Sequence, residues 1–293
     1  MPKFAWEPII QCLRNDHSTK PRSNGITMVI DTGLGIENCR DTLVHSGHLV
    51  DHWKFGFGTS VFVDREALKR KLKLLEDHSV LTFPGGTLLE VALVEHHCQV
   101  YMHHARELGF SAVEISDGTI PMPRFRRKKI IQCAIDAGLV PITEVGKKDP
   151  KKQISTTQLA EEALEDLSWG AKWVIVEGRE SGVGVGVFED DGEVMEEAVA
   201  IIESMMGNQV DQLIWEAPLK SQQTVLIEKF GTNVNFGNIQ HDQVLSLEAL
   251  RAGLRFETMH AVTDYLIDTG GWDPQEIEPP VEHVDSVSLK RVK

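Results

Sequence analysis

One short segment combines carboxylates and amines closely enough to handle an anion and a metal ion together. It is Glu144-Val145-Gly146-Lys147-Lys148-Asp149, and it follows the apolar run LVPIT. Its glycine allows a bend between the first carboxylate and the two amines. Adjacent lysines are also common on solvated loops, so a surface loop is the alternative interpretation. The position of the segment in the fold decides between the two.

Acidic side chains also end other apolar runs, and together they are too many for one pocket unless cations offset them. The acidic residues are Glu114, Asp117, Glu144, Glu177 and Glu216, and the nearby cations are Lys54, Lys147 and Arg179. A hard divalent ion such as Mg2+ would accommodate this excess, because it takes one or two carboxylates plus water and substrate oxygens. A ring of salt bridges without a metal is the alternative.

The elements that must position these groups follow from a repeat. Eight apolar runs alternate with segments of helix length whose apolar residues are spaced three or four apart. This is the pattern of a single-domain (β/α)8 TIM barrel, in which all strands point to one mouth. The expected strands are 26–31, 50–55, 79–83, 111–115, 139–144, 172–177, 212–216 and 232–236. We expect the barrel to span 20–265, with an N-terminal extension at 1–19 and a C-terminal tail at 266–293.

Donors for an anion follow the last runs. Phosphate in such barrels often binds at the loops after strands seven and eight, near a helix N-terminus. Lys220, Asn235 and Asn238 lie after the corresponding runs. Arg179 could hold a carboxylate or sulfonate by paired hydrogen bonds. Polar capping of the strand ends, and pairing of Arg179 with a neighbouring glutamate, are the alternatives.

Composition excludes several classes of partner. The 293 residues carry a formal net charge of −14 at pH 7, which argues against nucleic acid and against an anionic membrane surface. No apolar run approaches the ~20 residues of a membrane helix, and MPKFAWEPII lacks the pattern of a signal peptide. Cys12, Cys39, Cys98 and Cys133 lie far apart and are expected to be reduced thiols. A cytoplasmic protein is therefore expected.

A basic run opens one of the expected helices. It contains Arg124, Arg126, Arg127, Lys128 and Lys129. In a protein of this acidic balance we expect a solvated helix face, not a nucleic-acid site. Arg124 or Arg126 could still reach the mouth of the barrel from the helix start.

Eight segments in this order resemble the phosphosulfolactate synthase family over roughly residues 20–260. They are KPRSNGITMVIDTGLG, KFGFGTS, FPGGTLLE, LGFSAVEISDGTI, EVGKKD, EGRESG, WEAPLKSQQ and NVNFGNI. The resemblance implies a (β/α)8 barrel and a lyase that adds sulfite to phosphoenolpyruvate with Mg2+, giving (2R)-O-phospho-3-sulfolactate. In methanogens this reaction opens coenzyme M biosynthesis, and some bacteria use the product toward sulfolactate. Phe57 stands where the family pattern has tryptophan. This difference leaves the charged groups unchanged but bears on the local shape of the pocket.

The chemistry implied by the resemblance assigns a role to each charged strand end. Sulfite is already a good nucleophile, so the main tasks are to stabilise charge on the substrate carboxylate and to deliver a proton to C2. We expect a lysine with a lowered pKa as the proton donor, namely Lys147, with Lys148 or Lys54 as the alternatives. Glu114, Glu144 and Glu177 are the expected metal ligands, and Asp117 and Glu216 are further candidates. Arg179, Lys220, Asn235 and Asn238 are placed on phosphate and sulfonate oxygens.

Two other functions remain open on the sequence. A Schiff-base aldolase would also place a lysine at a barrel strand end. The chain could also be a non-catalytic or altered-substrate barrel, as in the plant heat-stress-associated members of the same family. Barrels of this size often assemble, so a homo-oligomer is one option, and the sequence leaves the oligomeric state open.

Overall fold

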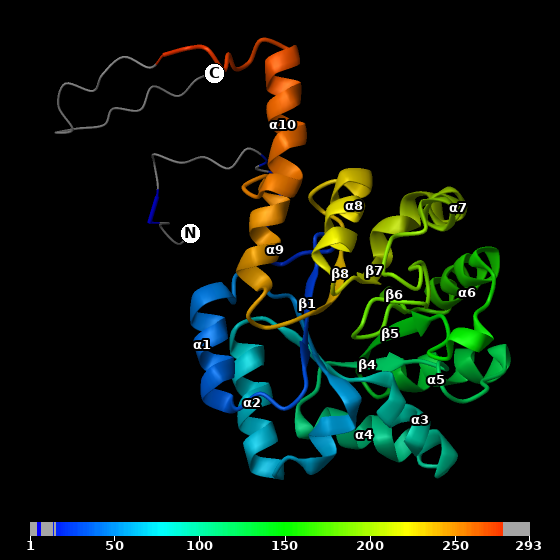
Figure 1. Ribbon diagram of the computed structural model, residues 1–293. Helices are drawn as coiled ribbons and strands as arrows, with labels where there is room; N and C mark the ends of the chain where they lie inside the picture. The colour runs from blue at the N-terminus through cyan, green and yellow to red at the C-terminus, as the bar shows by residue number, and fades with distance from the viewer. Residues whose placement is uncertain (1–4, 7–13, 15, 278–293) are drawn as a thin grey trace.

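A computed structural model describes residues 5–6, 14 and 16–277 of the chain. Eight parallel strands form one sheet in the order β3-β2-β1-β8-β7-β6-β5-β4 (Figure 1). The strands are β1 (Thr27–Asp31), β2 (His52–Phe55), β3 (Leu81–Pro84), β4 (Ala112–Ile115), β5 (Val140–Val145), β6 (Trp173–Val176), β7 (Leu213–Glu216) and β8 (Phe236–Ile239). The ring closes between β3 and β4, where the N–H of Ser111 donates to the carbonyl of Thr82 at 3.1 Å. The predicted (β/α)8 barrel is confirmed.

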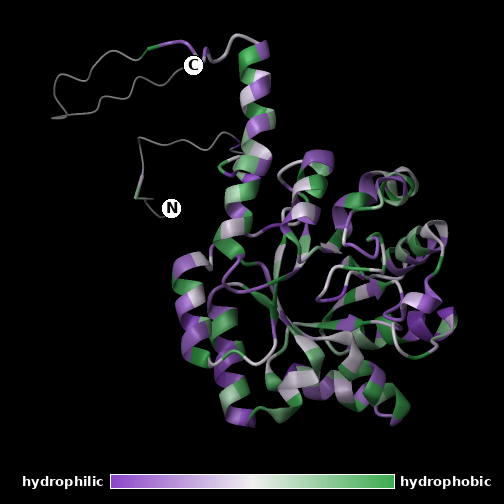
Figure 2. Ribbon diagram, viewed as in Figure 1, coloured by the Kyte–Doolittle hydropathy of each residue, from purple (hydrophilic) through white to green (hydrophobic). Residues whose placement is uncertain are grey.

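Helices surround this sheet (Figure 1). They are α1 (Ile36–Ser46), α2 (Arg65–Asp77), α3 (Gly86–Val94), α4 (Cys98–Leu108), α5 (Arg124–Asp136), α6 (Thr156–Ser168), α7 (Glu196–Met206), α8 (Lys220–Phe230), α9 (Val244–Arg251) and α10 (Phe256–Asp268). In the described part of the chain, 3₁₀ helices lie in the connections; they are η1 (Gly56–Phe62), η2 (Pro150–Lys152) and η3 (Gly207–Gln212). Figure 2 shows that the outer helices carry hydrophilic and hydrophobic residues side by side, as expected for helices that cover a sheet.

Helix α2 illustrates how the sequence forms one of these covering elements. It begins after Asp64, whose side chain accepts hydrogen bonds from two backbone N–H groups of the first turn. Leu68, Leu72 and Leu75 recur at helical spacing and are buried against the sheet. Lys71 lies on the same buried face and pairs with Asp31 at the end of β1. Asp31 is therefore used in packing α2 onto the sheet.

The inside of the barrel has an apolar lower part. Its buried residues are Ile26, Met28, Phe83, Ala112, Ile142, Trp173, Ile175 and Ile214. His52 is buried beside them, with its ring centroid 4.6 Å from that of Trp173 in an edge-on arrangement. Side chains two residues apart on a strand share a face, so Lys54 follows His52 on the inner face, closer to the mouth. The apolar part thus supports a charged layer above it.

The last strand departs most from its expected bounds. Strand β8 begins at Phe236, four residues after the expected start at 232, because Thr232 and Asn233 form a turn. Helix α10 runs to Asp268 and projects away from the barrel (Figure 1). Most of the predicted N-terminal extension lies outside the described residues, so the domain bounds stay predictions. Within the described part of the chain, no helix has both the length and the hydropathy to span a membrane.

Candidate active site

The C-terminal ends of the strands surround a cavity of about 350 Å3. The charged residues that line it are Lys54, Glu114, Lys148, Glu177, Arg179, Glu180 and Glu216. A larger groove of about 540 Å3 lies outside the barrel against α2, α3 and α4, and its lining is mostly apolar. We place the candidate site in the mouth of the barrel, because buried charges converge there and loops at this end carry the chemistry of such barrels.

Lys54 of β2 is the central cation of the mouth. Its side chain is 8% exposed, and its Nζ lies 2.9 Å from Glu114 Oε2 and 2.9 Å from Glu216 Oε1. Glu144 Oε2 lies 3.4 Å away. Burial favours the neutral amine, but the three carboxylates outweigh burial and hold the pKa of Lys54 well above its usual value. Lys54 is therefore a fixed positive charge in a buried layer.

Lys148 enters the same layer from the loop after β5. Its Nζ lies 2.6 Å from Glu144 Oε1 and 2.6 Å from Glu177 Oε2. Burial lowers its pKa, but the carboxylates of Glu144 and Glu177 outweigh burial and raise the pKa above its usual value. The expectation of a lysine with a lowered pKa is wrong for Lys148. The reason is that both of its near neighbours are negatively charged.

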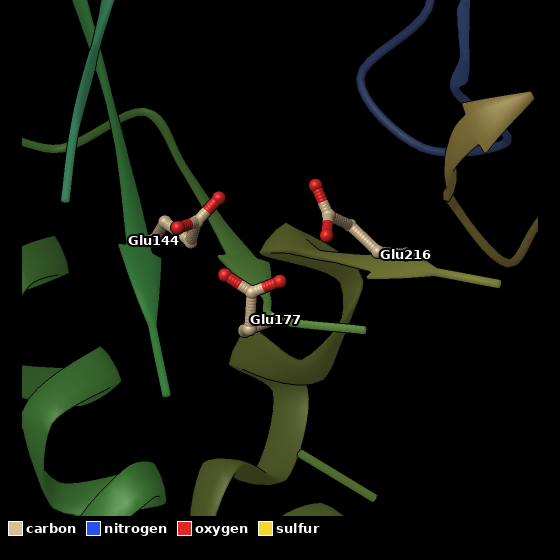
Figure 3. Close-up of side chains that lie close together, drawn as sticks. All are labelled: Glu144, Glu177 and Glu216. Atoms are coloured by element: carbon tan, nitrogen blue, oxygen red, sulfur yellow. The ribbon is translucent and has the colours of Figure 1, made fainter. Parts of the chain in front are cut away.

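Three carboxylates lie close enough together to hold one metal ion. Glu144, Glu177 and Glu216 each offer an oxygen, and these oxygens lie within 4.8 Å of one another (Figure 3). Burial, with the charges of Glu144 and Glu216, raises the pKa of Glu177 well above its usual value. Three carboxylates thus face two ammonium groups, and their mutual repulsion favours the protonated form of Glu177 unless a further cation binds. A set of oxygen donors with excess negative charge fits a hard divalent cation such as Mg2+.

Glu114, expected as a metal ligand, has other partners. Its Oε1 accepts a hydrogen bond of 2.7 Å from the N–H of Gly86, the first residue of α3. Its Oε2 faces Lys54 at 2.9 Å. Burial raises the pKa of Glu114 to about 7, with Lys54 opposing the shift. The structure thus brings Glu216, not Glu114, together with Glu144 and Glu177.

Lys147 does not enter the central cavity. Its Nζ donates to Asp117 Oδ2 at 2.6 Å and to the carbonyl of Asp117 at 2.9 Å. Both residues line a neighbouring groove beside the loop after β4. The expected first choice of proton donor and the candidate ligand Asp117 therefore bind each other outside the metal cluster. Lys148, the next residue, lines both the cavity and this groove.

Arg179 and Asn238 meet at the rim of the cavity in unusual backbone conformations. Their φ angles are 60° and 57°, and Phe57, on the same rim, has a φ of 55°. The Nδ2 of Asn238 donates to the carbonyl of Arg179 at 3.2 Å. Asn238 Oδ1 is buried without a hydrogen-bond partner among the described residues. Residues other than glycine are strained when φ is positive, and such backbone strain concentrates at functional sites.

Two expected substrate-binding residues lie elsewhere. Lys220, in the first turn of α8, points to Glu257 of α10 and forms an ion pair with it. Asn235 precedes β8, and its Oδ1 accepts from the N–H of Ile26 at 2.9 Å. Its Nδ2 donates to the carbonyl of Leu213 at 2.7 Å, which places it at the N-terminal end of the barrel. The prediction that Asn235 lies at the mouth is wrong, because the strand starts after it.

One element of the mouth was missed as a binding group. Helix α3 starts at Gly86, and Gly85, Gly86 and Thr87 line the cavity. A Cβ on Gly86 would lie 2.3 Å from Ser116 Oγ, so only glycine lets the helix start approach β4 this closely. The positive end of a helix favours anions. The signal in the sequence was the glycine pair between an apolar run and a helical pattern.

A (β/α)8 barrel with buried amines and carboxylates at its C-terminal mouth defines an enzyme of the TIM-barrel class. The family described as (2R)-phospho-3-sulfolactate synthase (ComA) matches residues 15–257, and the chain belongs to this family. A protein of Methanocaldococcus jannaschii named phosphosulfolactate synthase is 41% identical over 240 residues, which are 81% of this chain and 95% of that protein. A protein of the same name in Methanothermobacter thermautotrophicus is 38% identical over 247 residues, which are 84% of this chain and 95% of that protein.

Solved structures share the fold at low sequence identity. A putative fructose-1,6-bisphosphate aldolase from Coccidioides immitis superposes with a TM-score of 0.50 at 12% identity. The match covers 84% of this chain and 91% of that one. This likeness concerns the barrel alone.

Proposed function

We propose that the protein is a phosphosulfolactate synthase, a lyase that adds sulfite to phosphoenolpyruvate with Mg2+ to give (2R)-O-phospho-3-sulfolactate. The observation that carries the proposal is the buried layer in which Lys54 and Lys148 meet Glu144, Glu177 and Glu216. Relatives that bear the same name support it. The reaction needs fixed charge more than an activated nucleophile, and this layer supplies fixed charge.

Glu144, Glu177 and Glu216 would hold the metal ion. Their oxygens are mutually close, and their side chains are almost wholly buried. When bound, Mg2+ supplies Lewis-acid stabilisation of negative charge on the substrate carboxylate. The protein contributes the closed cluster and the exclusion of water around it.

Lys54 and Lys148 are the residues of the chain that stabilise charge and deliver the proton. The lone pair of sulfite sulfur attacks the methylene carbon of phosphoenolpyruvate, a C–S bond forms, and the π electrons of the C2–C3 bond move toward the carboxylate. Lys54, always charged, stabilises that negative charge. Lys148 then gives its proton to C2. Its raised pKa keeps it protonated at neutral pH, and proton transfer to a carbanion-like carbon does not require a strong acid.

Arg179, Asn238 and the start of α3 are the proposed binding groups for phosphate and sulfonate oxygens. Arg179 lies at the rim with a side chain that is 38% exposed, and its contact to Glu180 is a loose one of 3.7 Å. It is thus free to turn toward an anion and bind it by paired hydrogen bonds. Lys220 and Asn235, which lie elsewhere, have no part in this proposal. We place the reaction in the cytoplasm, with the product used toward coenzyme M or sulfolactate.

The ion pairs of the mouth disfavour a Schiff-base aldolase. An imine-forming lysine must attack as the neutral amine. Lys54 and Lys148 are both held in the charged form by buried carboxylates. Borohydride trapping with a keto substrate is expected to leave both lysines unmodified.

The test is the consumption of phosphoenolpyruvate by the purified protein with sulfite, in the presence of Mg2+ and in its absence. We expect turnover that needs both sulfite and the metal, with the sulfonated phosphoester as product. A folded protein that consumes no phosphoenolpyruvate under these conditions would favour the altered-substrate or non-catalytic alternative. The binding of phosphoenolpyruvate alone, measured by calorimetry, would then separate these two.

A further inference from the structure

Arg127 is buried beneath the loop that carries the two adjacent lysines, although it belongs to a basic run expected to be solvated. Its side chain is 1% exposed. Its Nε and Nη2 donate hydrogen bonds to the carboxylate of Asp166 of α6, the shortest at 2.6 Å. Burial lowers the pKa of Arg127, but Asp166 and Asp117 outweigh burial and raise it. Arg127 is therefore a permanent buried charge, and it lies outside the central cavity.

The same guanidinium holds both segments that flank the lysines. Nη2 donates to the backbone carbonyl of Glu144 at 2.9 Å, and Nη1 donates to Asp117 Oδ1 at 3.2 Å. Glu144 lies near the end of β5, just before the lysines, and Asp117 lies in the loop after β4. One side chain thus sets the distance between the two loops at this part of the mouth.

The side chains of Lys147 and Lys148 point in different directions from this loop, Lys147 toward Asp117 and Lys148 toward Glu144. Asp117, oriented by Arg127 through one oxygen, takes the Nζ of Lys147 at 2.6 Å with the other. Lys148 goes inward past Gly118, whose added Cβ would lie 2.9 Å from Lys148 Cγ. Since Lys147 is bound at Asp117, the neighbouring lysine is the one that reaches Glu144 and Glu177.

We propose that Arg127 and Asp117 are positioning residues that determine which of the two adjacent lysines enters the active site. Arg127 orients Asp117, Asp117 retains Lys147 outside the cavity, and Lys148 is left as the lysine that faces the substrate. This proposal rests on the proposed function for its catalytic consequence, but the placement of the lysines can be measured without any turnover.

The first test is the reactivity of each lysine toward acetic anhydride, mapped by peptide mass spectrometry. In Asp117→Ala we expect labelling of Lys147 to rise about fivefold, the factor expected when a partly exposed ion pair is lost. Asp136→Ala, which removes an exposed acid of α5, is the control and should label like the wild type. Labelling of Lys147 that is the same in Asp117→Ala and the wild type overturns the proposal.

The second test separates positioning from a purely structural role. For Asp117→Ala we expect kcat for sulfite-dependent consumption of phosphoenolpyruvate to fall about 10–100-fold, the range for groups that orient a site from outside it. The KM should change little, since Asp117 does not line the cavity. Asp117→Asn, which keeps one acceptor oxygen for either Arg127 or Lys147, should recover part of the loss. An unchanged kcat in Asp117→Ala overturns the proposal.

Arg127→Met is a further variant, with Lys129→Met on the exposed side of the same helix as its control. We expect Arg127→Met to raise Lys147 labelling and to lower kcat, and Lys129→Met to do neither. Removing Arg127 leaves the buried Asp166 with only the 3.9 Å contact to Arg124 and can unfold the protein. Asp117→Ala keeps the Arg127–Asp166 pair and is therefore the decisive variant. If labelling of Lys147 rises in Asp117→Ala as expected but the wild type shows no turnover, the proposed reaction is contradicted and the positioning of the lysines is supported.

Discussion

Gly118 lies directly against the side chain of Lys148: a Cβ at position 118 would be 2.9 Å from Lys148 Cγ and 3.2 Å from its Cε. The N–H of Lys148 also points to the carbonyl of Gly118, at 3.4 Å. The missing side chain at position 118 therefore gives the lysine its path from the loop into the mouth of the barrel. The ammonium group at the end of this path meets two buried carboxylates.

Gly118→Ala is expected to displace Lys148 and to lower kcat by up to about 100-fold, because a misplacement of about 1 Å has an effect of that order. Gly35→Ala is the matched control. Its φ is −67°, and an added Cβ would have no neighbour within 4 Å. Thermal unfolding of both variants should match the wild type. Wild-type turnover in Gly118→Ala would mean that the path of Lys148 is unimportant.

Lys148→Met and Lys147→Met should differ sharply, although the residues are adjacent. Lys148 lines the central cavity as a proposed proton donor, and its loss should lower kcat by about 10²–10⁴. Lys147 pairs with Asp117 outside that cavity, so its loss should have a small effect. Steady-state kinetics with sulfite and phosphoenolpyruvate measures both. A larger loss of kcat in Lys147→Met than in Lys148→Met would instead identify Lys147 as the proton donor.

Mg2+ should stabilise the folded protein, because the carboxylates of the mouth outnumber its ammonium groups. At a concentration of 100 times its Kd, a ligand that binds only the folded state adds about 2.7 kcal/mol to the free energy of unfolding. Glu216→Gln should weaken Mg2+ binding at least about tenfold, whereas Glu197→Gln, an exposed residue of α7, should not. Calorimetric titration and thermal unfolding with and without Mg2+ are the measurements. No binding to the wild type would remove the metal from the site.

His52 should make the barrel sensitive to acid. Burial lowers the pKa of His52 to about 3 from 6.5, and its Nδ1 has no hydrogen-bond partner among the described residues. Between these values the unfolded chain binds a proton that the folded chain does not. The free energy of unfolding should therefore fall with falling pH below 6.5 by up to about 1.4 kcal/mol per pH unit.

The variant His52→Phe isolates this contribution. Its free energy of unfolding, minus that of the wild type, should rise as the pH falls from 7 to 5 in urea titrations. His103→Gln, at an exposed position of α4, should show no such trend. A difference that stays constant with pH would show that the pKa of His52 is the same in the folded and unfolded protein.

The repeat of apolar runs was enough to predict the barrel, because strands and helices have different apolar periods and parallel strands must close with their ends at one mouth. It also placed Lys54, Glu114, Glu144, Glu177 and Glu216 at that mouth. Asn235 was misplaced for a local reason. The turn at Thr232 and Asn233 delays β8, and a shift of this size moves a residue from one end of a short strand to the other.

Arg127 shows a different limit of sequence reading. The next two residues, Lys128 and Lys129, are exposed on α5, whereas Arg127 is buried against Asp166. A run of charges does not reveal which of its members faces a buried carboxylate, because that partner comes from another helix far along the chain. The burial of Arg127 depends on the packing of α5 against α6.

The sequence by itself therefore determined the class of fold and the set of charged strand ends, since these depend on local periodicity and on residue types. Its ordered motifs carried the resemblance to the family. The tertiary structure alone decided that Lys148 and not Lys147 enters the mouth, and that Glu216 and not Glu114 joins Glu144 and Glu177. The physical reason is that the sequence does not show the contacts of side chains, whether in the loop of Lys147 and Lys148 or on the strands of Glu114 and Glu216. Their directions are set by long-range ion pairs and close backbone contacts, which form only when the barrel has closed.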